Sequence, residues 1–421
     1  MYRLQNTVRD YAWGSHTLMA HYLGRSPSKT PEAELWLGAH PGAPSIAENG
    51  TTKIRLDELI AANPGHALGD RSRAAFGDKL PFLLKVLAAG SPLSLQVHPT
   101  QDQAASGYAA EEASGVPRSA PTRNYKDFNH KPEMILALTE FAALCGFRPA
   151  AQSSAVFGSI VSSFKAAGAK TPGVLDEVRC NLSGSNESAA IRTAFSRLIR
   201  GGSDVSHTVH IVAELLRERI PEGPHAVEFE TALALNDAYP GDPGVLISLM
   251  LNKVTLHPGE AVFLPAGNIH AYLHGLGIEV MASSDNVLRG GLTSKHIDVE
   301  ELMSTVEFKP LPVPRINASA PSRGRQVWEP PFDEFQLQRL ETRPGEGIQL
   351  PAGAPAIVLA VAGAGVLSSR NTALDLLRGD SAFISADEGP AMLQAVGPEA
   401  VVAFVATIAA NPASPVRSGQ P

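Results

Sequence analysis

The pattern of apolar and polar positions divides the chain into regions of two kinds. From residue 1 to about 150, and again from 245 to about 410, short apolar runs alternate with Gly and Pro turns, which is typical of β-strands. Between 151 and 244, apolar positions recur every three or four residues, as they do from 191 to 199, and this spacing predicts amphipathic helices. We therefore expect a mainly β protein with an α-helical insert.

Individual elements are expected within these regions. Residues 55–66 and 70–77 have the spacing of short surface helices, and residues 297–305 predict another helix. Residues 81–88 form an apolar run of strand length that contains Lys85. Because a lysine is rarely buried without a partner, we expect its amine either to reach solvent or to face an anionic substrate.

Polar side chains share one face of the strand predicted at residues 93–98. Ser94, Gln96 and His98 alternate there with apolar residues, and residues two apart in a strand lie on the same face. A strand with one apolar face and one face of Ser, Gln and His lines a cavity more often than it faces solvent.

The segment 256–296 carries the highest density of candidate functional groups. A Pro-Gly turn, an apolar strand at 261–264 and a Pro-Ala-Gly turn precede His270, which we place at the start of the next strand. The second half of the segment is polar in an otherwise apolar setting, and such clusters usually converge on a ligand. Its polar residues are Glu279, Ser283, Ser284, Asp285, Asn286 and Arg289.

Composition and charge exclude several classes of protein. The formal net charge of −7 gives no electrostatic reason to expect nucleic acid as a partner. Two cysteines, Cys145 and Cys180, do not make a disulfide framework and fit a reducing cytoplasm. No apolar run approaches the ~18 residues of a membrane-spanning helix, and the N-terminus has no signal-peptide core. We therefore expect a cytoplasmic protein without a membrane partner.

Two spaced motifs supply candidate metal ligands. The turn before His270 follows the spacing G-x5-P-x-G-x2-H and resembles the second motif of cupin barrels. The first cupin motif, G-x5-H-x-H, is matched with Gln96 in place of the first His and His98 as the second. Glu133, at the start of a later strand, takes the place of the acid that normally comes next. Each motif alone is weak, because a lone His after a turn is more often structural, but together they favour a metal site.

These ligands suit a borderline divalent ion. Two imidazoles, one carboxylate and one amide oxygen, from Gln96, His98, Glu133 and His270, predict one Zn²⁺ per chain. Mn²⁺, Fe²⁺ and Co²⁺ are also compatible with this set.

Several segments resemble the type I phosphomannose isomerases. The most specific are YKDFNHKPE at 125–133 and the stretch from His270 to Lys295, and the shorter matches are YAWG at 11–14, AELW at 33–36 and LSLQVHP at 93–99. The resemblance covers residues 1 to about 310. Gly290 and Ser294 stand where the family usually has Ala and Pro, and neither change removes a reactive group.

The resemblance implies a fold with two cupin-type (jelly-roll) β-barrels, the first of them metal-binding, and a helical domain. Residues 1–150 and 245–315 would form the two parts of the catalytic barrel, and residues 151–244 the helical insert. Residues 316–421 would form a degenerate cupin-like barrel. Within it, residues 377–386 align with 256–265 if one residue slips, but no His comes after them, so we expect this second barrel to lack metal ligands.

The resemblance also implies a reversible aldose–ketose isomerisation of mannose 6-phosphate to fructose 6-phosphate through a cis-enediolate, in mannose metabolism or GDP-mannose supply. By similarity Arg289 is the catalytic arginine, and Lys85 and Ser94 occupy positions suggested for phosphate binding. Trp13 offers a flat apolar face for a sugar ring. The proton-transferring groups stay open among Lys131, His130, Glu279 and Asp285.

Two other functions share part of this pattern. Another metal cupin enzyme, such as a dioxygenase or a different sugar-phosphate isomerase, would need the metal ligands but not Lys85, Lys131 and Arg289. A non-catalytic sugar-binding cupin would tolerate the loss of Arg289. The expected partner is a small sugar phosphate, and a monomer is favoured.

Overall fold

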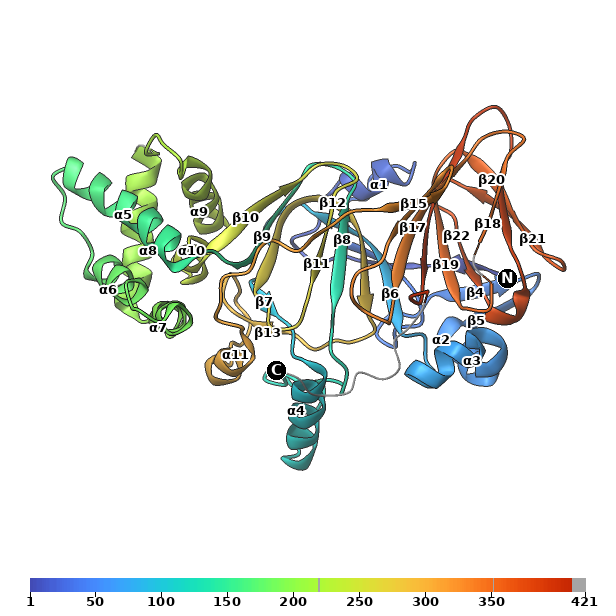
Figure 1. Cartoon of the computed structure of the whole chain (residues 1–421), viewed down its shortest axis with the longest axis horizontal. Helices are drawn as coiled ribbons and strands as arrows, with labels where there is room; N and C mark the ends of the chain where they lie inside the picture. The colour runs from blue at the N-terminus through green and yellow to red at the C-terminus, as the bar shows by residue number, and fades with distance from the viewer. Residues whose placement is uncertain (219, 351, 411–421) are drawn as a thin grey trace.

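A computed structural model describes residues 1–218, 220–350 and 352–410 of the chain. The structure is a mixed α/β protein in which most strands gather into three sheets. Figure 1 shows a group of consecutive helices at one end, a sheet in the middle and the C-terminal strands at the other end. The expected abundance of strands in sheets is confirmed.

The middle sheet, called the site sheet below, has eleven strands among the described residues. Seven of them succeed one another in hydrogen-bonded order: β14 (Arg315–Ile316), β11 (Ala261–Leu264), β8 (Glu133–Ala137), β12 (His270–Ala282), β6 (Phe82–Ala89), β3 (Glu34–Leu37) and β2 (Thr7–Arg9). Two others, β7 (Gln96–Val97) and β9 (Phe141–Phe147), also pair with β12. The last two extend them, since β13 (Leu288–Arg289) pairs with β7 and β10 (Leu251–Leu256) pairs with β9.

Strand β12 changes partners along its length, and this change places the candidate site. Its first residues pair with β9, and from Gly275 onward it pairs with β6. Gly275 has a φ of 125°, and a Cβ there would lie 2.6 Å from the carbonyl oxygen of Glu140, so the bend requires glycine. The bend leaves His270 directly opposite Gln96 on β7.

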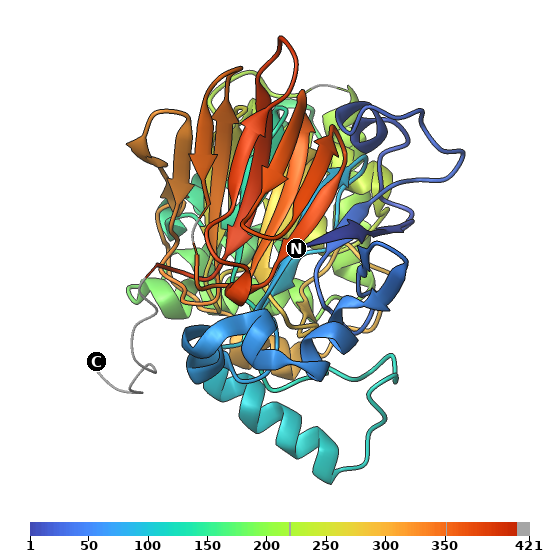
Figure 2. The same cartoon turned by 90° about the vertical axis from the view of Figure 1, so that its right-hand side faces the viewer.

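The remaining strands form two sheets, called the C-terminal sheets below. The nine-stranded sheet has the order β15 (Ser319–Ser322), β16 (Arg325–Trp328), β17 (Gln336–Thr342), β24 (Val401–Thr407), β19 (Ala356–Ala362), β22 (Ser381–Ile384), β1 (Tyr2–Gln5), β4 (Ile46–Asn49) and β5 (Thr52–Arg55). The four-stranded sheet has the order β18 (Gly347–Gln349), β23 (Met392–Ala395), β20 (Ala364–Ser368) and β21 (Ala373–Leu377). Figure 2 shows the N-terminal strand lying beside the C-terminal ones.

Alternating side chains on the nine-stranded sheet bury two apolar layers. Leu337 and Leu359 pack with Val86 of the site sheet, whereas Leu340 and Val358 face the four-stranded sheet. Burial of these two faces holds the site sheet and the C-terminal sheets together.

Helices dominate the segment between β9 and β10, where no strand occurs among the described residues. In chain order they are α5 (Ala150–Ala166), α6 (Gly173–Leu182), α7 (Glu187–Ile199), α8 (Ser203–Glu218), α9 (Ala226–Ala238) and α10 (Gly244–Ser248). Their apolar faces share one core, in which Phe157, Phe195 and Phe229 are buried. None of the helices in the described ranges combines the length and apolar character that crossing a membrane requires.

The remaining helices lie outside this group. They are α1 (Leu18–Tyr22), α2 (Leu56–Ala62), α3 (Pro64–Phe76), α4 (Gln101–Ala113), α11 (Val299–Thr305) and the 3₁₀ turn η1 (Ala386–Glu388). Of these, α4 projects away from the sheets (Figure 1). The helix predicted at 55–66 is interrupted, because α2 ends at Ala62 and Pro64, after the Asn63 cap, starts α3. The break predicted at 67–69 is confirmed, since Gly69 has non-helical angles of φ 72° and ψ 164°.

Two further expectations are settled by local geometry. The strand predicted at 93–98 is shorter, since only Gln96 and Val97 pair as a strand and Ser94 lies in the loop before them. The frayed tail predicted at 411–421 lies outside the described residues.

Candidate metal centre and active site

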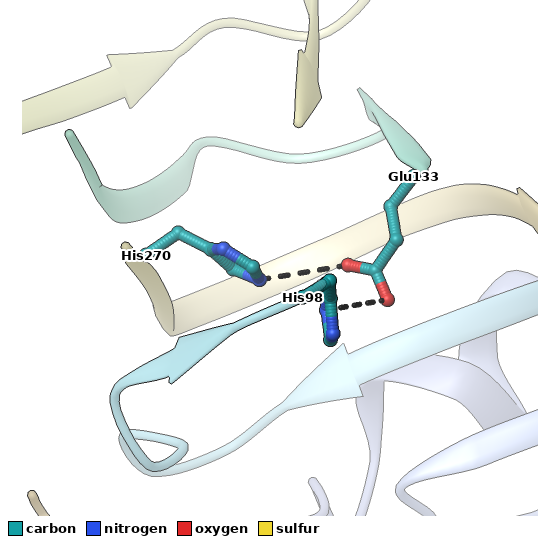
Figure 3. Close-up of side chains that lie close together, drawn as sticks. All are labelled: His98, Glu133 and His270. Atoms are coloured by element: carbon teal, nitrogen blue, oxygen red, sulfur yellow. Dashed lines mark ion pairs between the residues drawn. The ribbon is translucent and has the colours of Figure 1, made fainter. Parts of the chain in front are cut away.

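Three buried side chains from three different strands converge on one point (Figure 3). His98 comes directly after β7, Glu133 begins β8 and His270 begins β12. The Nε2 atom of His98 lies 3.3 Å from Oε1 of Glu133, and Nε2 of His270 lies 3.6 Å from Oε2 of the same carboxylate. One ligand atom from each residue lies within 4.8 Å of the others.

Backbone carbonyls fix the orientation of both imidazoles. Nδ1 of His98 lies 2.8 Å from the carbonyl oxygen of Asn286, and Nδ1 of His270 lies 3.0 Å from that of Asn268. A carbonyl only accepts, so each Nδ1 must carry the proton and each Nε2 presents a lone pair. Burial lowers the pKa of His98 to about 4, against the opposing effect of Glu133, so this imidazole is neutral near pH 7.

The three residues therefore present electron pairs to one another. Nε2 of His98 is buried and makes no hydrogen bond within the described residues, although it faces a carboxylate. Lone pairs in such contact repel unless a cation lies between them. Bond lengths of about 2.0–2.2 Å in a tetrahedral zinc site place ligand atoms roughly 3.3 Å apart, which the His98–Glu133 separation of 3.3 Å matches. The residues fit a zinc ion.

The Glu133 carboxylate is held in its charged form. Burial alone would raise its pKa, but Lys131 and the neighbouring imidazoles lower it well below the usual range. Nζ of Lys131 lies 3.1 Å from Oε1 of Glu133, and Lys131 is itself buried. A charged carboxylate is the form that binds a metal. Lys131 therefore helps to keep Glu133 ready for metal binding, and its amine lies beside His98, Glu133 and His270, which are called the metal group below.

Gln96, the fourth predicted ligand, lies between two functional strands. It is opposite His270 on β12 and opposite Arg289 on β13. The strand pairing thus brings the metal group and the predicted catalytic arginine to adjacent positions of one sheet.

Arg289 belongs to a group of cations without a neutralising acid. Burial lowers its pKa, and no carboxylate in the described residues offsets that shift. Lys295 also has a lowered pKa, caused by burial and then by the charges of Arg289 and Lys126. Unneutralised cations attract an anion, so this cluster is suited to a phosphate or a developing oxyanion. Sequence reasoning missed Lys295 and Lys126, although both lie inside the family-like segments.

A second charged cluster lies on β3, β6 and β12. Nζ of Lys85 is 2.9 Å from Oε2 of Glu279 and 3.3 Å from Oε1 of Glu34. Burial would lower the Lys85 pKa, but the two carboxylates raise it overall, whereas burial raises the pKa of Glu279. Trp36 donates its Nε1–H to Glu34 over 2.8 Å. Lys85 is therefore buried, and its amine pairs with two carboxylates and does not reach solvent.

Asn286 forms hydrogen bonds both with the family-like loop at 124–132 and with His98 of the metal group. Its side chain accepts from the backbone N–H of Lys126 and donates to the carbonyl oxygens of Asp127 and Asn129. Its own carbonyl accepts from His98. Sequence reasoning noted Asn286 only as one member of a polar group, because such a bridge between distant segments has no local pattern.

The other predicted residues lie in varied surroundings. Asp285 is half-buried, and its Oδ1 lies 3.5 Å from Nε2 of buried His40. His130 is half-buried, and its Nε2 lies 2.5 Å from Oε1 of Glu334. Trp13 stacks on Tyr11 with ring centroids 5.7 Å apart. None of these contacts tests the roles predicted for the three residues.

Comparison with known proteins agrees with this geometry. The family model of the phosphomannose isomerase type I catalytic domain matches residues 1–150. The chain is 37% identical over 401 residues to mannose-6-phosphate isomerase from Escherichia coli, covering 94% of this chain and 98% of that protein. It is 36% identical over 403 residues to mannose-6-phosphate isomerase 1 from Arabidopsis thaliana, covering 91% and 89%.

A solved structure is similar over nearly the whole chain. Mannose 6-phosphate isomerase from Salmonella typhimurium, bound to fructose 6-phosphate and zinc, superposes with a TM-score of 0.85 at 35% identity. The match covers 97% of this chain and 100% of that one. Relatives at this identity and coverage share the fold and the family, and so this chain belongs to the type I phosphomannose isomerases.

Proposed function

We propose that this protein interconverts mannose 6-phosphate and fructose 6-phosphate at a site built around one zinc ion. The observation that carries the proposal is the convergence of His98, Glu133 and His270 with their lone pairs facing one point. Gln96 would complete the ligand set, since its strand position is opposite His270. When bound, zinc supplies a Lewis acid that stabilises negative charge on the sugar oxygens at C1 and C2.

The cationic cluster supports the binding of a phosphorylated substrate. Arg289 pairs with Gln96 of β7, which also pairs with His270, and this register supports a role for its guanidinium in balancing charge that develops on the enediolate oxygens. Lys295 and Lys126 extend the cluster and suit the phosphate. Ser94 and Lys85 were expected to bind phosphate. The pairing of Lys85 with two buried carboxylates favours a different role, in which it keeps Glu279 charged.

Proton transfer between C1 and C2 requires groups close to the metal. We retain Lys131, Glu279 and Asp285 as candidates, because Lys131 contacts Glu133, Glu279 belongs to a buried charged cluster and Asp285 precedes Asn286. For His130, whose imidazole pairs with Glu334, we propose a positioning role. Trp13 stays the candidate for a sugar-ring wall.

We further propose the domain plan and physical state that the family resemblance implies. Residues 1–150 and 245–315 would form a metal-binding cupin barrel, with 151–244 as a helical domain and 316–421 as a second barrel. In this plan β1, β4 and β5 come from the first segment of the chain but belong to the second barrel, since they follow β22 in the order of its sheet. A monomer in the cytoplasm is proposed, and the two free cysteines are consistent with that location.

A coupled assay tests the reaction directly. Purified protein is given mannose 6-phosphate, and fructose 6-phosphate is detected with its downstream enzymes, in parallel with glucose 6-phosphate and other aldose phosphates. We expect turnover of mannose 6-phosphate under anaerobic conditions. A requirement for oxygen would instead favour the dioxygenase alternative.

A further inference from the structure

The C-terminal sheets contain a cavity of about 340 Å³, far along the chain from the metal ligands. It opens at the end of β15, β16, β17 and β24, where Arg71 of α3 forms another wall. This volume is in the range of pockets that take a small organic molecule. We call it the C-terminal cavity; its lining is Arg71, Ser319, Pro321, Arg325, Val327, Glu329, Gln336, Gln338, Ala352, Thr407 and Ala410.

Polar side chains occupy core positions in this cavity. On β17, Leu337 packs toward the site sheet, while Gln336 and Gln338 lie on the other face, which further along holds the apolar core residue Leu340. Gln336 is 5% exposed and Gln338 2% exposed, so both amides are buried. An apolar residue would be expected at such positions, because burying an amide without partners costs about 1–3 kcal/mol.

The buried amide of Gln338 lacks a partner. Its Oε1 atom makes no hydrogen bond within the described residues. Thr407, also buried, donates its hydroxyl to the carbonyl oxygen of Pro355, so it does not satisfy Gln338. A buried acceptor beside a cavity of this size can accept a hydrogen bond from water or from a ligand that enters the cavity.

Two guanidinium groups give the cavity its charge. Arg325 donates through Nη2 to the carbonyl oxygen of Gln349, but its Nε is buried without a partner. Arg71 donates to the carbonyl oxygens of Ala409 and Ala410. Neither arginine forms an ion pair within the described ranges, so both retain their charge for an anion. Glu329, the only acid in the lining, is exposed at the rim.

We propose that the C-terminal cavity is a second binding site, which takes a small hydroxylated anion of the size of a hexose phosphate. The guanidinium groups of Arg325 and Arg71 would hold the anionic group, and the amides of Gln336 and Gln338 would bind hydroxyls. The site is separate from the metal group and does not depend on the reaction proposed there.

Sorbitol 6-phosphate is a suitable probe, because it has no carbonyl group and cannot be isomerised. Calorimetric titration of the zinc-loaded protein is expected to resolve two binding events per chain, one at the metal site and one in the cavity. Arg325→Leu and Gln338→Leu should each weaken the second event at least tenfold while turnover of mannose 6-phosphate stays within twofold. Arg289→Ala should leave the second event unchanged.

Controls separate the proposal from a structural role of these residues. Arg323→Leu removes the same charge from an exposed arginine two residues away and should not affect either event. Gln338→Leu removes the unpartnered oxygen at similar volume, so this variant should fold even where Arg325→Leu does not. A single event in the wild type, untouched by both cavity variants, would show that the cavity holds only water and would overturn the proposal. Equal affinity for uncharged sorbitol would overturn the requirement for an anion.

Discussion

Two strand connections, one in each half of the molecule, share a turn but differ in the segment after their second strand. In the β10–β11 turn, Glu260 accepts from the backbone N–H of His257, over 2.8 Å, and Gly259 has a φ of 91°. In the β21–β22 turn, Asp380 accepts from the N–H of Leu377, over 2.9 Å, and Gly379 has a φ of 93°. The two turns therefore align residue for residue, without the one-residue slip expected from the sequence.

The segments diverge after the second strand. In the site sheet a turn through Gly267 leads to His270 and β12, whereas the corresponding residues after β22 form η1 and then Pro390. The two connections thus share a backbone turn, but only the first leads to a His at the start of the next strand. The difference shows that strand–turn–strand geometry supports the fold alone, and that chemistry depends on the few residues beyond the turn.

The largest effect is expected from His270→Ala. The change removes one of three converging metal ligands, so we expect loss of zinc and a fall in activity of about a thousandfold or more, because the metal contributes several kcal/mol. Zinc content and the coupled assay measure both. His274→Ala changes an exposed His of the same strand and serves as the control. Retention of zinc by the His270 variant would contradict the assignment.

Arg289→Ala should have the next largest effect. Loss of one preorganised charge at a developing oxyanion typically costs about 10²–10³ in turnover. The zinc content should stay at that of the wild type, because Arg289 is not a ligand. Arg289→Lys should recover part of the activity, and near-normal turnover in the alanine variant would favour a non-catalytic sugar-binding protein.

Lys85→Met tests the buried charged cluster of the site sheet. Glu279 and Glu34 would remain buried without their cation, so we expect a loss of about 3–5 kcal/mol in the free energy of unfolding. Urea denaturation measures it, with Lys79→Met at an exposed position as control. Unchanged stability would mean that the two carboxylates take up protons at little cost.

Glu260→Gln should have the smallest effect on stability. It changes the β10–β11 turn, whose geometry the β21–β22 turn repeats. The hydrogen bond from the backbone N–H of His257, helped by the Arg315 guanidinium, lowers the Glu260 pKa against the opposing effect of desolvation. A lowered pKa stabilises the fold above the unfolded-state value, and this contribution is lost as pH falls through the folded-state value. The melting temperatures of variant and wild type should differ slightly at pH 7 and converge in acid. A difference that persists in acid would exclude this electrostatic origin.

The sequence predicted the parts of the site that match motifs. His98 and His270 were predicted from motif spacing and Glu133 from its place at the start of a later strand, and the structure brings the three together. The pairing of Lys85 with Glu34 and Glu279 was not foreseen, because it depends on the register of three strands from distant segments. Lys295 was missed, and Asn286 was noted only as one member of a polar group, because each also interacts with Lys126 of the distant segment 124–132.

The fold was predictable to a similar degree. Apolar periodicity indicated the strands and the helical segment correctly, but the pairing of β1 with β22 joins the two ends of the chain and leaves no local signal. Asn63 shows the same limit at short range, since its cap starts a new helix within the segment predicted as one helix, whereas the break at Gly69 was predicted.

The proposed activity depends on a zinc ion held by His98, Glu133 and His270. A decisive measurement is turnover of mannose 6-phosphate by protein stripped with a chelator and then titrated with Zn²⁺, with the bound metal determined by elemental analysis. We predict no turnover in the stripped protein and full recovery at one zinc per chain. Full activity in protein shown to be free of metal would contradict the zinc dependence.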